Sequence, residues 1–354
     1  MYKRQRDGSI RRWDRRKAKV LLRWIPHQTL VTHIAVSPDG KWVFSAGRNV
    51  VVESNIATGK PRFTWPRHSG AATAVAVLPG GVVAISASAD GTMRKWEIIS
   101  GKCLGTIKVK GATPGVYAVA VSPDGKRIAA GCKDGVIREY DTQKGTLIRQ
   151  LKGHFGYVRC LVYTHDGKRL LSSADDGAVR IWPAEGEKPI AILKGHRGGV
   201  LSVAVSSNDK YVLTGGRDAT VRLWDLKKAK LIKICTGHRG WVEAVRFIGD
   251  SKYGISAGGD GRILKWDLRK GKILSEMNHG KWVYALACTA DGKIAFAAGQ
   301  DGTITCWDLR KTRQITHFSG HAGKILDLAI TPDGKHLISA GEDTTLLVWK
   351  VPSR

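Results

Sequence analysis

A period of about 42 residues constrains this chain more than any other feature. The dipeptide Trp-Asp, or a relative of it, recurs nine times in steps of 41 to 44 residues. The positions are Trp13, Ser54, Trp96, Tyr140, Trp182, Trp224, Trp266, Trp307 and Trp349. Such a repeat indicates an architecture in which each unit packs on its neighbours, which allows 354 residues to form one domain.

Each period predicts four short strands separated by polar turns. In one unit the strands are expected at Val200–Val205, Tyr211–Gly215, Thr220–Trp224 and Leu231–Cys235. Apolar side chains alternate within these segments with a period of two, which is typical of strands rather than helices. The unit is therefore predicted to be a four-stranded antiparallel sheet.

Four residue types recur at fixed spacing within the units. An Asp falls six residues before the Trp, a Ser or Thr ten before it, and a His opens the unit. Five sets are complete: His68, Ser86, Asp90 and Trp96; His154, Ser172, Asp176 and Trp182; His196, Thr214, Asp218 and Trp224; His238, Ser256, Asp260 and Trp266; and His321, Ser339, Asp343 and Trp349. These residues resemble the WD-repeat family, from about Gly8 to Lys350. The resemblance implies an all-β β-propeller and a structural hydrogen-bond network in each set.

We expect eight blades, with seven as the alternative. Seven units carry all four strands, whereas the last, Lys324–Lys350, supplies three. Because the family usually closes its ring across the chain ends, Ala18–Trp24 is expected to provide the missing strand. Residues 18–354 are thus predicted to form the propeller.

Residues 1–17 are predicted to be an adapter-like start followed by the remnant of an upstream blade. The first five residues, Met-Tyr-Lys-Arg-Gln, match the translated end of a common sequencing adapter. The hypothesis is a bacterial-type protein truncated at its N-terminus, and an in-frame genomic extension upstream of Met1 would support it.

Three units depart from the repeat. The unit ending at Ser54 lacks its Trp, and the unit ending at Tyr140 has Ala112 and Ala130 where His and Ser are expected. The unit ending at Trp307 has Ala297 in place of the hydroxyl. We expect these blades to be softer.

Recurring Ser, His and Asp residues also invite a hydrolase interpretation. The set occurs five times without a nucleophile elbow or an oxyanion-hole motif, so a network that satisfies buried polar groups explains it better. The His and Cys residues lack metal-ligand spacing, and the glycine-rich fragments lie in hairpin turns. We therefore predict a protein that is not an enzyme and has no metal and no cofactor.

The cysteines and apolar segments bear on location. The six cysteines are widely spaced without a CxxC pair, which favours free thiols in a reducing compartment. No apolar run reaches the roughly 18 residues of a membrane span, and the charged start lacks a signal sequence. The expectation is a cytoplasmic monomer, and the uniform Ser-Pro-Asp-Gly-Lys turns favour a bacterial source.

The resemblance implies a top rim, where the loops carrying the His and the Asp meet and where the family most often binds partners. The candidate binding residues are Tyr117, Lys133, Tyr157, Arg159, Arg217, Trp241, Glu243, Trp282 and Tyr284, and Asp175, Gln300 and Glu342 also precede an Asp. Aromatic residues with Arg are typical of interface hot spots. The leading hypothesis is a non-catalytic scaffold that binds a protein or peptide partner there, although some of these side chains could pack over the blade core instead.

The opposite, bottom rim is rich in Lys and Arg, and 58 basic residues against 30 acidic ones give the chain a net charge of +28. Turn residues predicted there are Lys41, Lys126, Lys168, Lys210, Lys252, Lys293 and Lys335, with Lys227, Lys228, Lys230, Arg269, Lys270, Lys272, Arg310, Lys311 and Arg313. The alternative function is an electrostatic adaptor for nucleic acid or another polyanion, whereas ordinary turn and edge-protecting lysines are the simpler interpretation. A third alternative is the sensor region of a larger signalling protein such as a bacterial protein kinase.

Overall fold

The computed structural model describes residues 68–111, 115–249 and 251–352 in full, and the backbone of seven strands between residues 2 and 64. The chain divides into two compact units. The first contains Met1–Ser69 and Gly101–Cys103, and the second contains Gly70–Ser100 and Leu104–Arg354. Each unit is described by itself.

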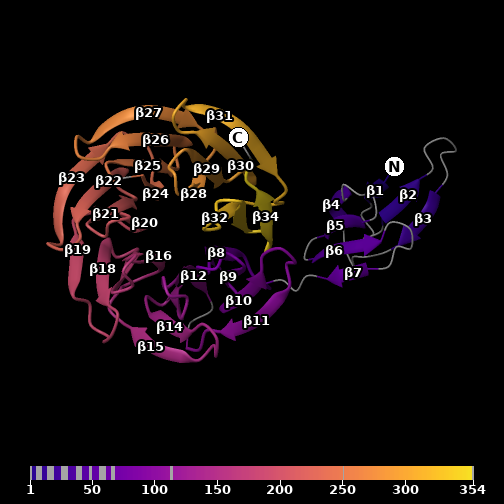
Figure 1. Ribbon diagram of the computed structural model, residues 1–354, viewed down its shortest axis with the longest axis horizontal. Helices are drawn as coiled ribbons and strands as arrows, with labels where there is room; N and C mark the ends of the chain where they lie inside the picture. Colours follow the sequence, from indigo (N-terminus) through magenta and orange to yellow (C-terminus); the bar gives the residue numbers. More distant parts are fainter. Residues whose placement is uncertain are drawn as a thin grey trace. The chain divides into compact units, whose positions relative to one another are not determined.

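The second unit is a ring of seven blades (Figure 1). Six blades have four strands: β8 (Ala72–Val77), β9 (Val83–Ser88), β10 (Thr92–Glu97) and β11 (Cys103–Lys108); β12 (Val116–Val121), β13 (Arg127–Cys132), β14 (Ile137–Asp141) and β15 (Leu147–Leu151); β16 (Val158–Tyr163), β17 (Arg169–Ala174), β18 (Ala178–Pro183) and β19 (Ala191–Lys194); β20 (Val200–Val205), β21 (Tyr211–Gly216), β22 (Thr220–Asp225) and β23 (Lys230–Thr236); β24 (Val242–Ile248), β25 (Tyr253–Gly258), β26 (Arg262–Asp267) and β27 (Lys272–Asn278); and β28 (Val283–Cys288), β29 (Ile294–Gly299), β30 (Thr303–Asp308) and β31 (Arg313–Ser319). The last blade has three strands, β32 (Ile325–Ile330), β33 (His336–Gly341) and β34 (Leu346–Lys350).

Within a blade the strands are antiparallel and follow chain order from the centre outward (Figure 1). The predicted strands of the specimen unit agree with β20 to β23 within one residue at their ends. The innermost strands of neighbouring blades pack on one another. The core lies between blades, where Trp182, Trp266 and Phe296 are fully buried, so each blade depends on its neighbours for an apolar interior.

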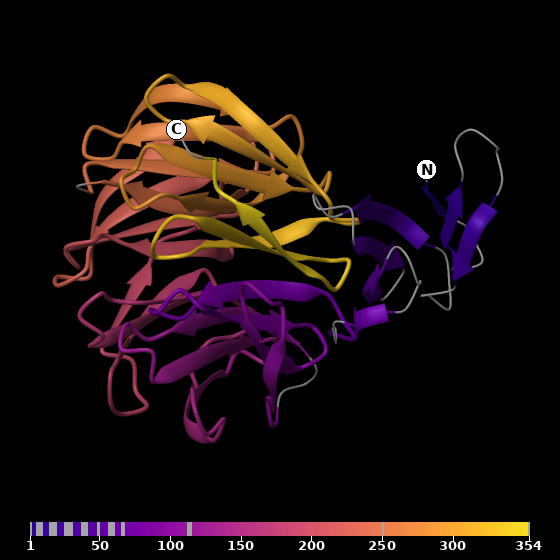
Figure 2. The same ribbon diagram turned by 45° about the vertical axis from the view of Figure 1, so that its right-hand side comes forward.

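The ring closes between the first and last blades, because β8 packs against β32 and β33. Both views show these blades side by side (Figures 1 and 2). The Asp327 carboxylate on β32 accepts a hydrogen bond of 2.9 Å from the Val75 amide on β8. The prediction of eight blades is therefore wrong and seven is correct. The sequence period counts repeats, whereas closure depends on which innermost strands meet, and that contact leaves no periodic signal.

The first unit contains two sheets. One has the order β1 (Tyr2–Arg4), β2 (Ile10–Trp13) and β3 (Val20–Trp24), and the other has the order β4 (Val31–Val36), β5 (Trp42–Gly47), β6 (Val50–Asn55) and β7 (Pro61–Thr64). The proposed start at residue 18 and the closing role of 18–24 stay predictions, since residues 14–19 lie outside the described residues and β3 pairs with β2. Met1, Lys41 and Ala112 also lie outside them.

All six cysteines are free. Within the described residues there is no helix of the length and apolarity that a membrane crossing requires.

Candidate functional site

Complete hydrogen-bond networks are seen in the recurring sets of Trp182, Trp224, Trp266 and Trp349. In each, His Nε2 lies 2.6–2.7 Å from the hydroxyl oxygen and His Nδ1 lies 2.9–3.0 Å from the Asp carboxylate. The Trp Nε1 donates to the same hydroxyl at 2.7–2.9 Å. In the set of Trp96, Nε1 donates to Ser86 at 2.7 Å.

A hydroxyl, a His and an Asp in hydrogen-bond contact resemble the triad of a hydrolase, but the burial of these groups does not suit catalysis. The hydroxyls of Ser172, Thr214 and Ser256 belong to residues with no exposed surface. Each hydroxyl is also bonded on both sides, to a Trp and to a His. Burial would raise the pKa of Asp260, but hydrogen bonds from His238 and from the Arg239 amide outweigh it and lower the pKa to about 2. The networks therefore hold the loops of the top rim in place.

In the blade with Ala297, a residue on the neighbouring strand supplies the hydroxyl of the network. Thr305 on β30 is the register partner of Ala297, and its hydroxyl lies 2.9 Å from His279 Nδ1. Trp307 Nε1 donates to the same hydroxyl at 2.8 Å, and His279 Nε2 lies 3.3 Å from Asp301. The interpretation that this blade lost its hydroxyl is corrected, because a cross-strand residue supplies one. In the blade with Ala130, Arg138 pairs with Asp134 at 2.7 Å and donates to the Gly111 carbonyl at 2.9 Å.

A β-bulge at the start of the innermost strand positions one residue per blade. In β24, Val242 pairs with Gly258 and Ala244 with Ala257, so Glu243 is an extra residue. The same shift occurs in all seven blades, and the bulged residues are Thr73, Tyr117, Arg159, Leu201, Glu243, Tyr284 and Leu326. Bulges redirect side chains, and all seven of these residues line one central cavity.

The first half of a continuous side-chain row begins at Tyr117. Its ring centroid lies 5.1 Å from that of Tyr157, over which Arg159 lies at 4.8 Å and Lys133 at 5.4 Å. Arg159 donates two hydrogen bonds, of 2.9 and 2.8 Å, to the Asp175 carboxylate. Cation–π contact and ion pairing thus order these side chains.

The second half continues from Asp175, which also pairs with Arg217 at 3.1 Å. Arg217 lies 4.8 Å from the ring centroid of Trp241, which meets Trp282 edge-on at 5.6 Å. Trp282 stacks on Tyr284 at 5.8 Å. We call Tyr117, Lys133, Tyr157, Arg159, Asp175, Arg217, Trp241, Trp282 and Tyr284 the aromatic row. The row covers five adjacent blades. Eight of its nine residues, all except Asp175, are among the nine predicted top-rim residues, and the ninth predicted residue is Glu243.

Glu243 lies beneath the row and carries an unusual carboxyl group. Its Oε1 accepts a hydrogen bond of 3.0 Å from Trp282 Nε1. Burial raises the pKa of Glu243 to about 7, although Trp282, Arg159 and Arg217 act in the opposite direction. This carboxyl therefore changes charge near neutral pH.

Two glycines allow the Trp residues of the row to sit close to the second strands. A Cβ at Gly258 would lie 1.9 Å from the Trp241 carbonyl oxygen, and one at Gly299 would lie 1.8 Å from that of Trp282. The amides of Gly259 and Gln300 donate to the same two carbonyls at 2.9 Å. Backbone packing on glycine thus fixes where both indoles leave the blade.

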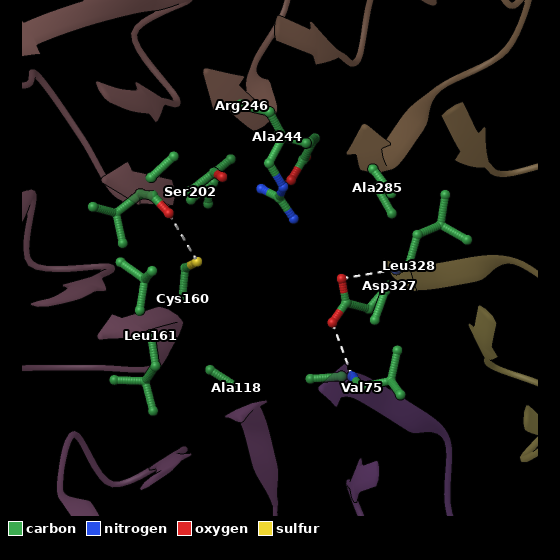
Figure 3. A pocket seen from close by; sticks show the side chains of 18 of the residues that line it. Val75, Ala118, Cys160, Leu161, Ser202, Ala244, Arg246, Ala285, Asp327 and Leu328 are labelled. Atoms are coloured by element: carbon green, nitrogen blue, oxygen red, sulfur yellow. Dashed lines mark hydrogen bonds between the residues drawn. The ribbon is translucent and has the colours of Figure 1, made fainter. Parts of the chain in front are cut away.

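Below the row, the innermost strands enclose a cavity of about 920 Å³. Figure 3 shows Arg246 and Asp327 extending into it from different blades. Both Asp327 oxygens accept backbone hydrogen bonds, from Val75 at 2.9 Å and Leu328 at 2.8 Å. Burial raises the pKa of Asp327 to about 6, against the effects of these bonds and of Arg246. Similar cross-blade bonds run from Val245 to Ser202 at 3.2 Å.

Sequence reasoning found four of the seven bulged residues and missed Thr73, Leu201 and Leu326. Their position, directly after the first apolar residue of strand one, was the available signal. Thr, Leu and Leu at this position are not typical of interface hot spots, so residue type alone does not single them out. Gln300 and Glu342 lie on the same rim: the Gln300 amide donates to the Trp282 carbonyl of the row at 2.9 Å, and Glu342 pairs with Lys324 at 3.6 Å. Among the described residues, no group of His, Cys, Asp and Glu is arranged to hold a metal.

Comparisons with known proteins agree with this geometry. The family described as WD domain, G-beta repeat matches eight segments: 18–49, 59–97, 101–141, 145–183, 187–225, 229–267, 271–308 and 312–350. Pre-mRNA-processing factor 19 homolog 2 of Arabidopsis thaliana is 28% identical over 165 residues, which cover 45% of this chain and 31% of the relative. Autophagy-related protein 16 of the same plant is 27% identical over 150 residues, covering 42% and 29%.

Mitochondrial division protein 1 of Saccharomyces cerevisiae is 25% identical over 190 residues, which cover 42% of this chain and 26% of the relative. The matched segments thus span less than a third of each of these relatives. All three relatives are eukaryotic, so the bacterial source stays a prediction.

Proposed function

The chain belongs to the WD40 family of G-beta repeat proteins, and we propose that its ring is a non-catalytic scaffold that binds a protein or peptide through the aromatic row. WD40 propellers generally mediate protein–protein interaction. The proposal assigns that general role to one rim and to named side chains.

The continuity of the row over five blades is the observation that carries the proposal. Trp241 keeps 42% of its surface exposed although its ring is held by Arg217 and Trp282. Side chains that are already ordered lose little conformational freedom on binding, so more of the contact energy appears as affinity. Large aromatic residues beside Arg are also the residues that dominate binding energies at interfaces.

The recurring sets do not suit catalysis, because their reactive groups are inaccessible and the same set recurs in several blades. Repeated His, Asp and hydroxyl groups are buried, and they are used up by hydrogen bonds within each blade. A general base and nucleophile must reach the reacting atoms of a substrate. The proposed function therefore needs shape and charge complementarity only.

The test begins with a photoreactive phenylalanine analogue at position 241. A protein that crosslinks from 241, and not from Tyr211 on the bottom rim, is identified and purified. Its affinity is then measured for the wild-type chain and for the variant Trp241→Ser with Tyr284→Ser. Two hot spots of about 2 kcal/mol each predict roughly a thousandfold loss.

The matched control is Phe155→Ser, because Phe155 is 80% exposed beside His154 and outside the row. This control is expected to bind as well as the wild type does. Equal affinity for the row variant, with its near-ultraviolet circular dichroism and melting temperature retained, would contradict the proposal. Crosslinking only from the bottom rim would also contradict it.

A further inference from the structure

The basic residues of the bottom rim are unevenly distributed among the blades, which the net charge of the chain does not show. The turns from third to outermost strand read DLKKAK at Asp225–Lys230, DLRKGK at Asp267–Lys272 and DLRKTR at Asp308–Arg313, with nine basic residues against three acidic ones. The corresponding turns of the other four-stranded blades, Glu97–Lys102, Asp141–Thr146 and Pro183–Lys188, have three basic residues against four acidic ones. The three basic turns belong to adjacent blades, whose outermost strands β23, β27 and β31 follow one another in Figure 1.

Hydrogen bonds show that these turns share the bottom rim with the lysine turns of the same blades. The Leu226 amide donates to the Lys210 carbonyl at 2.9 Å, and the corresponding bonds recur in the next two blades at 3.1 and 2.9 Å. The bonds place both turns of a blade at one end of its sheet, opposite the aromatic row.

The acidic groups of the basic turns are occupied by their own backbone. Asp225 Oδ1 accepts a hydrogen bond of 2.7 Å from the Lys228 amide, and Asp267 Oδ1 accepts one of 3.1 Å from the Lys270 amide. Asp308 Oδ1 bonds the Lys311 amide at 3.0 Å. All nine basic side chains are exposed, and none forms an ion pair with another described residue. Their charge is therefore available to a partner.

Exposed aliphatic side chains lie beside this charge. Ile232, Leu274 and Ile315 occupy the same position, two residues after the last basic residue of each turn, and are 42–47% exposed. Leu104, Ile148 and Ile190 hold the same position on the other four-stranded blades and are 47–57% exposed. Among the six four-stranded blades described in the second unit, exposed aliphatic groups and an excess of basic over acidic turn residues occur together in these three adjacent blades only.

We propose that this basic sector, formed by Asp225–Lys230, Asp267–Lys272 and Asp308–Arg313 with Ile232, Leu274 and Ile315, binds the surface of an anionic lipid bilayer. Basic residues are attracted to negatively charged headgroups, and aliphatic side chains insert between them. Nucleic acid fits less well, since single strands are held by stacking on free aromatic rings. The two nearby tyrosines are engaged: Arg269 bonds the Tyr211 hydroxyl at 3.3 Å, and Lys252 lies over Tyr253 at 5.1 Å.

The experiment measures sedimentation of the full chain with vesicles of 70% phosphatidylcholine and 30% phosphatidylserine in 100 mM salt. Binding is expected to these vesicles and not to pure phosphatidylcholine, and it should weaken as salt is raised to 500 mM. The charge variant is Lys228→Gln, Lys270→Gln and Lys311→Gln. At about fivefold for each lysine, it should lower the partition coefficient roughly 100-fold.

Matched controls come from the other blades. Lys126→Gln, Lys144→Gln and Lys188→Gln remove the same charge from the bottom rim outside the sector, and are expected to retain most of the binding. Ile232→Ser, Leu274→Ser and Ile315→Ser should weaken binding at least tenfold, whereas Leu104→Ser, Ile148→Ser and Ile190→Ser should not. Melting temperatures and circular dichroism verify that each variant is folded.

Three outcomes would overturn the proposal. One is the absence of binding to anionic vesicles, and another is equal loss in the sector and control variants. The third is sector-dependent binding of a 30-nucleotide RNA or DNA probe without vesicle binding, which would assign the sector to nucleic acid.

Discussion

Thr305→Val tests whether one hydroxyl rebuilt the network of the blade that contains Ala297. Valine retains the shape of threonine but leaves Trp307 Nε1 and His279 Nδ1 without their bonds of 2.8 and 2.9 Å. Both groups are enclosed, since Trp307 is 7% exposed and the His279 side chain has no exposed surface. A buried polar group that loses its partner costs roughly 1–3 kcal/mol, so two groups predict a loss of about 2–6 kcal/mol.

The assay is urea unfolding at pH 7.5, monitored by tryptophan fluorescence. Thr106→Val on the exposed face of β11 is the matched control, with an expected change within about 0.5 kcal/mol. Adding Ala297→Ser to Thr305→Val places the hydroxyl where the other blades have it, so at least half of the lost stability should return. A loss below about 1 kcal/mol, or no recovery in the double variant, would refute the argument.

Three further predictions concern charge and packing. Hydrogen bonds lower the pKa of Asp260 to about 2, so the contribution of its carboxylate to the free energy of unfolding is present above about pH 4 and lost as the pH falls. In acid unfolding, Asp260→Asn should therefore lose roughly 2 kcal/mol less of its free energy of unfolding than the wild type as the pH falls below about 4. Burial raises the pKa of Glu243 to about 7, so wild type should lose roughly 3 kcal/mol relative to Glu243→Gln as pH rises from about 4.5 to 7, measured by urea unfolding. Gly299→Ala puts a Cβ 1.8 Å from the Trp282 oxygen and should lower the melting temperature and alter near-ultraviolet dichroism, whereas Gly80→Ala meets nothing within 4 Å.

Much of the fold could be predicted because the repeat is written in residues that are local in sequence. The spacing of Ser256 and Trp266 on neighbouring strands reports a hairpin register directly. The ring size could not be obtained in this way, since it depends on contact between Val75 and Asp327, which are separated by 252 residues. The role of Thr305 could not be predicted for a related reason. Its hydroxyl takes the place of the one missing at Ala297, but it comes from the paired strand and not from the expected position along the chain.

The site was partly predictable because the β-bulge recurs with the period of the blade. The bulge is the same in each blade, but the bulged residue differs. The backbone therefore fixes the seven positions, and the residue at each position, such as Thr73, Tyr117 or Glu243, sets the chemistry of the surface. The sequence alone does not show which side chains of the aromatic row contact one another, such as the pairing of Asp175 with Arg159 and Arg217.

The two proposed surfaces are compatible because they occupy opposite ends of the same strands. Strands of six residues at about 3.3 Å per residue separate the rims by roughly 20 Å, which exceeds the Debye length of about 8 Å at physiological salt. The nine cations of the basic sector should therefore have little influence on charge at Glu243 or on a partner held by Trp241. If both proposals hold, saturating anionic vesicles should leave the affinity for the crosslinked partner unchanged. A tenfold loss of that affinity on vesicle binding would mean that the two surfaces overlap or compete.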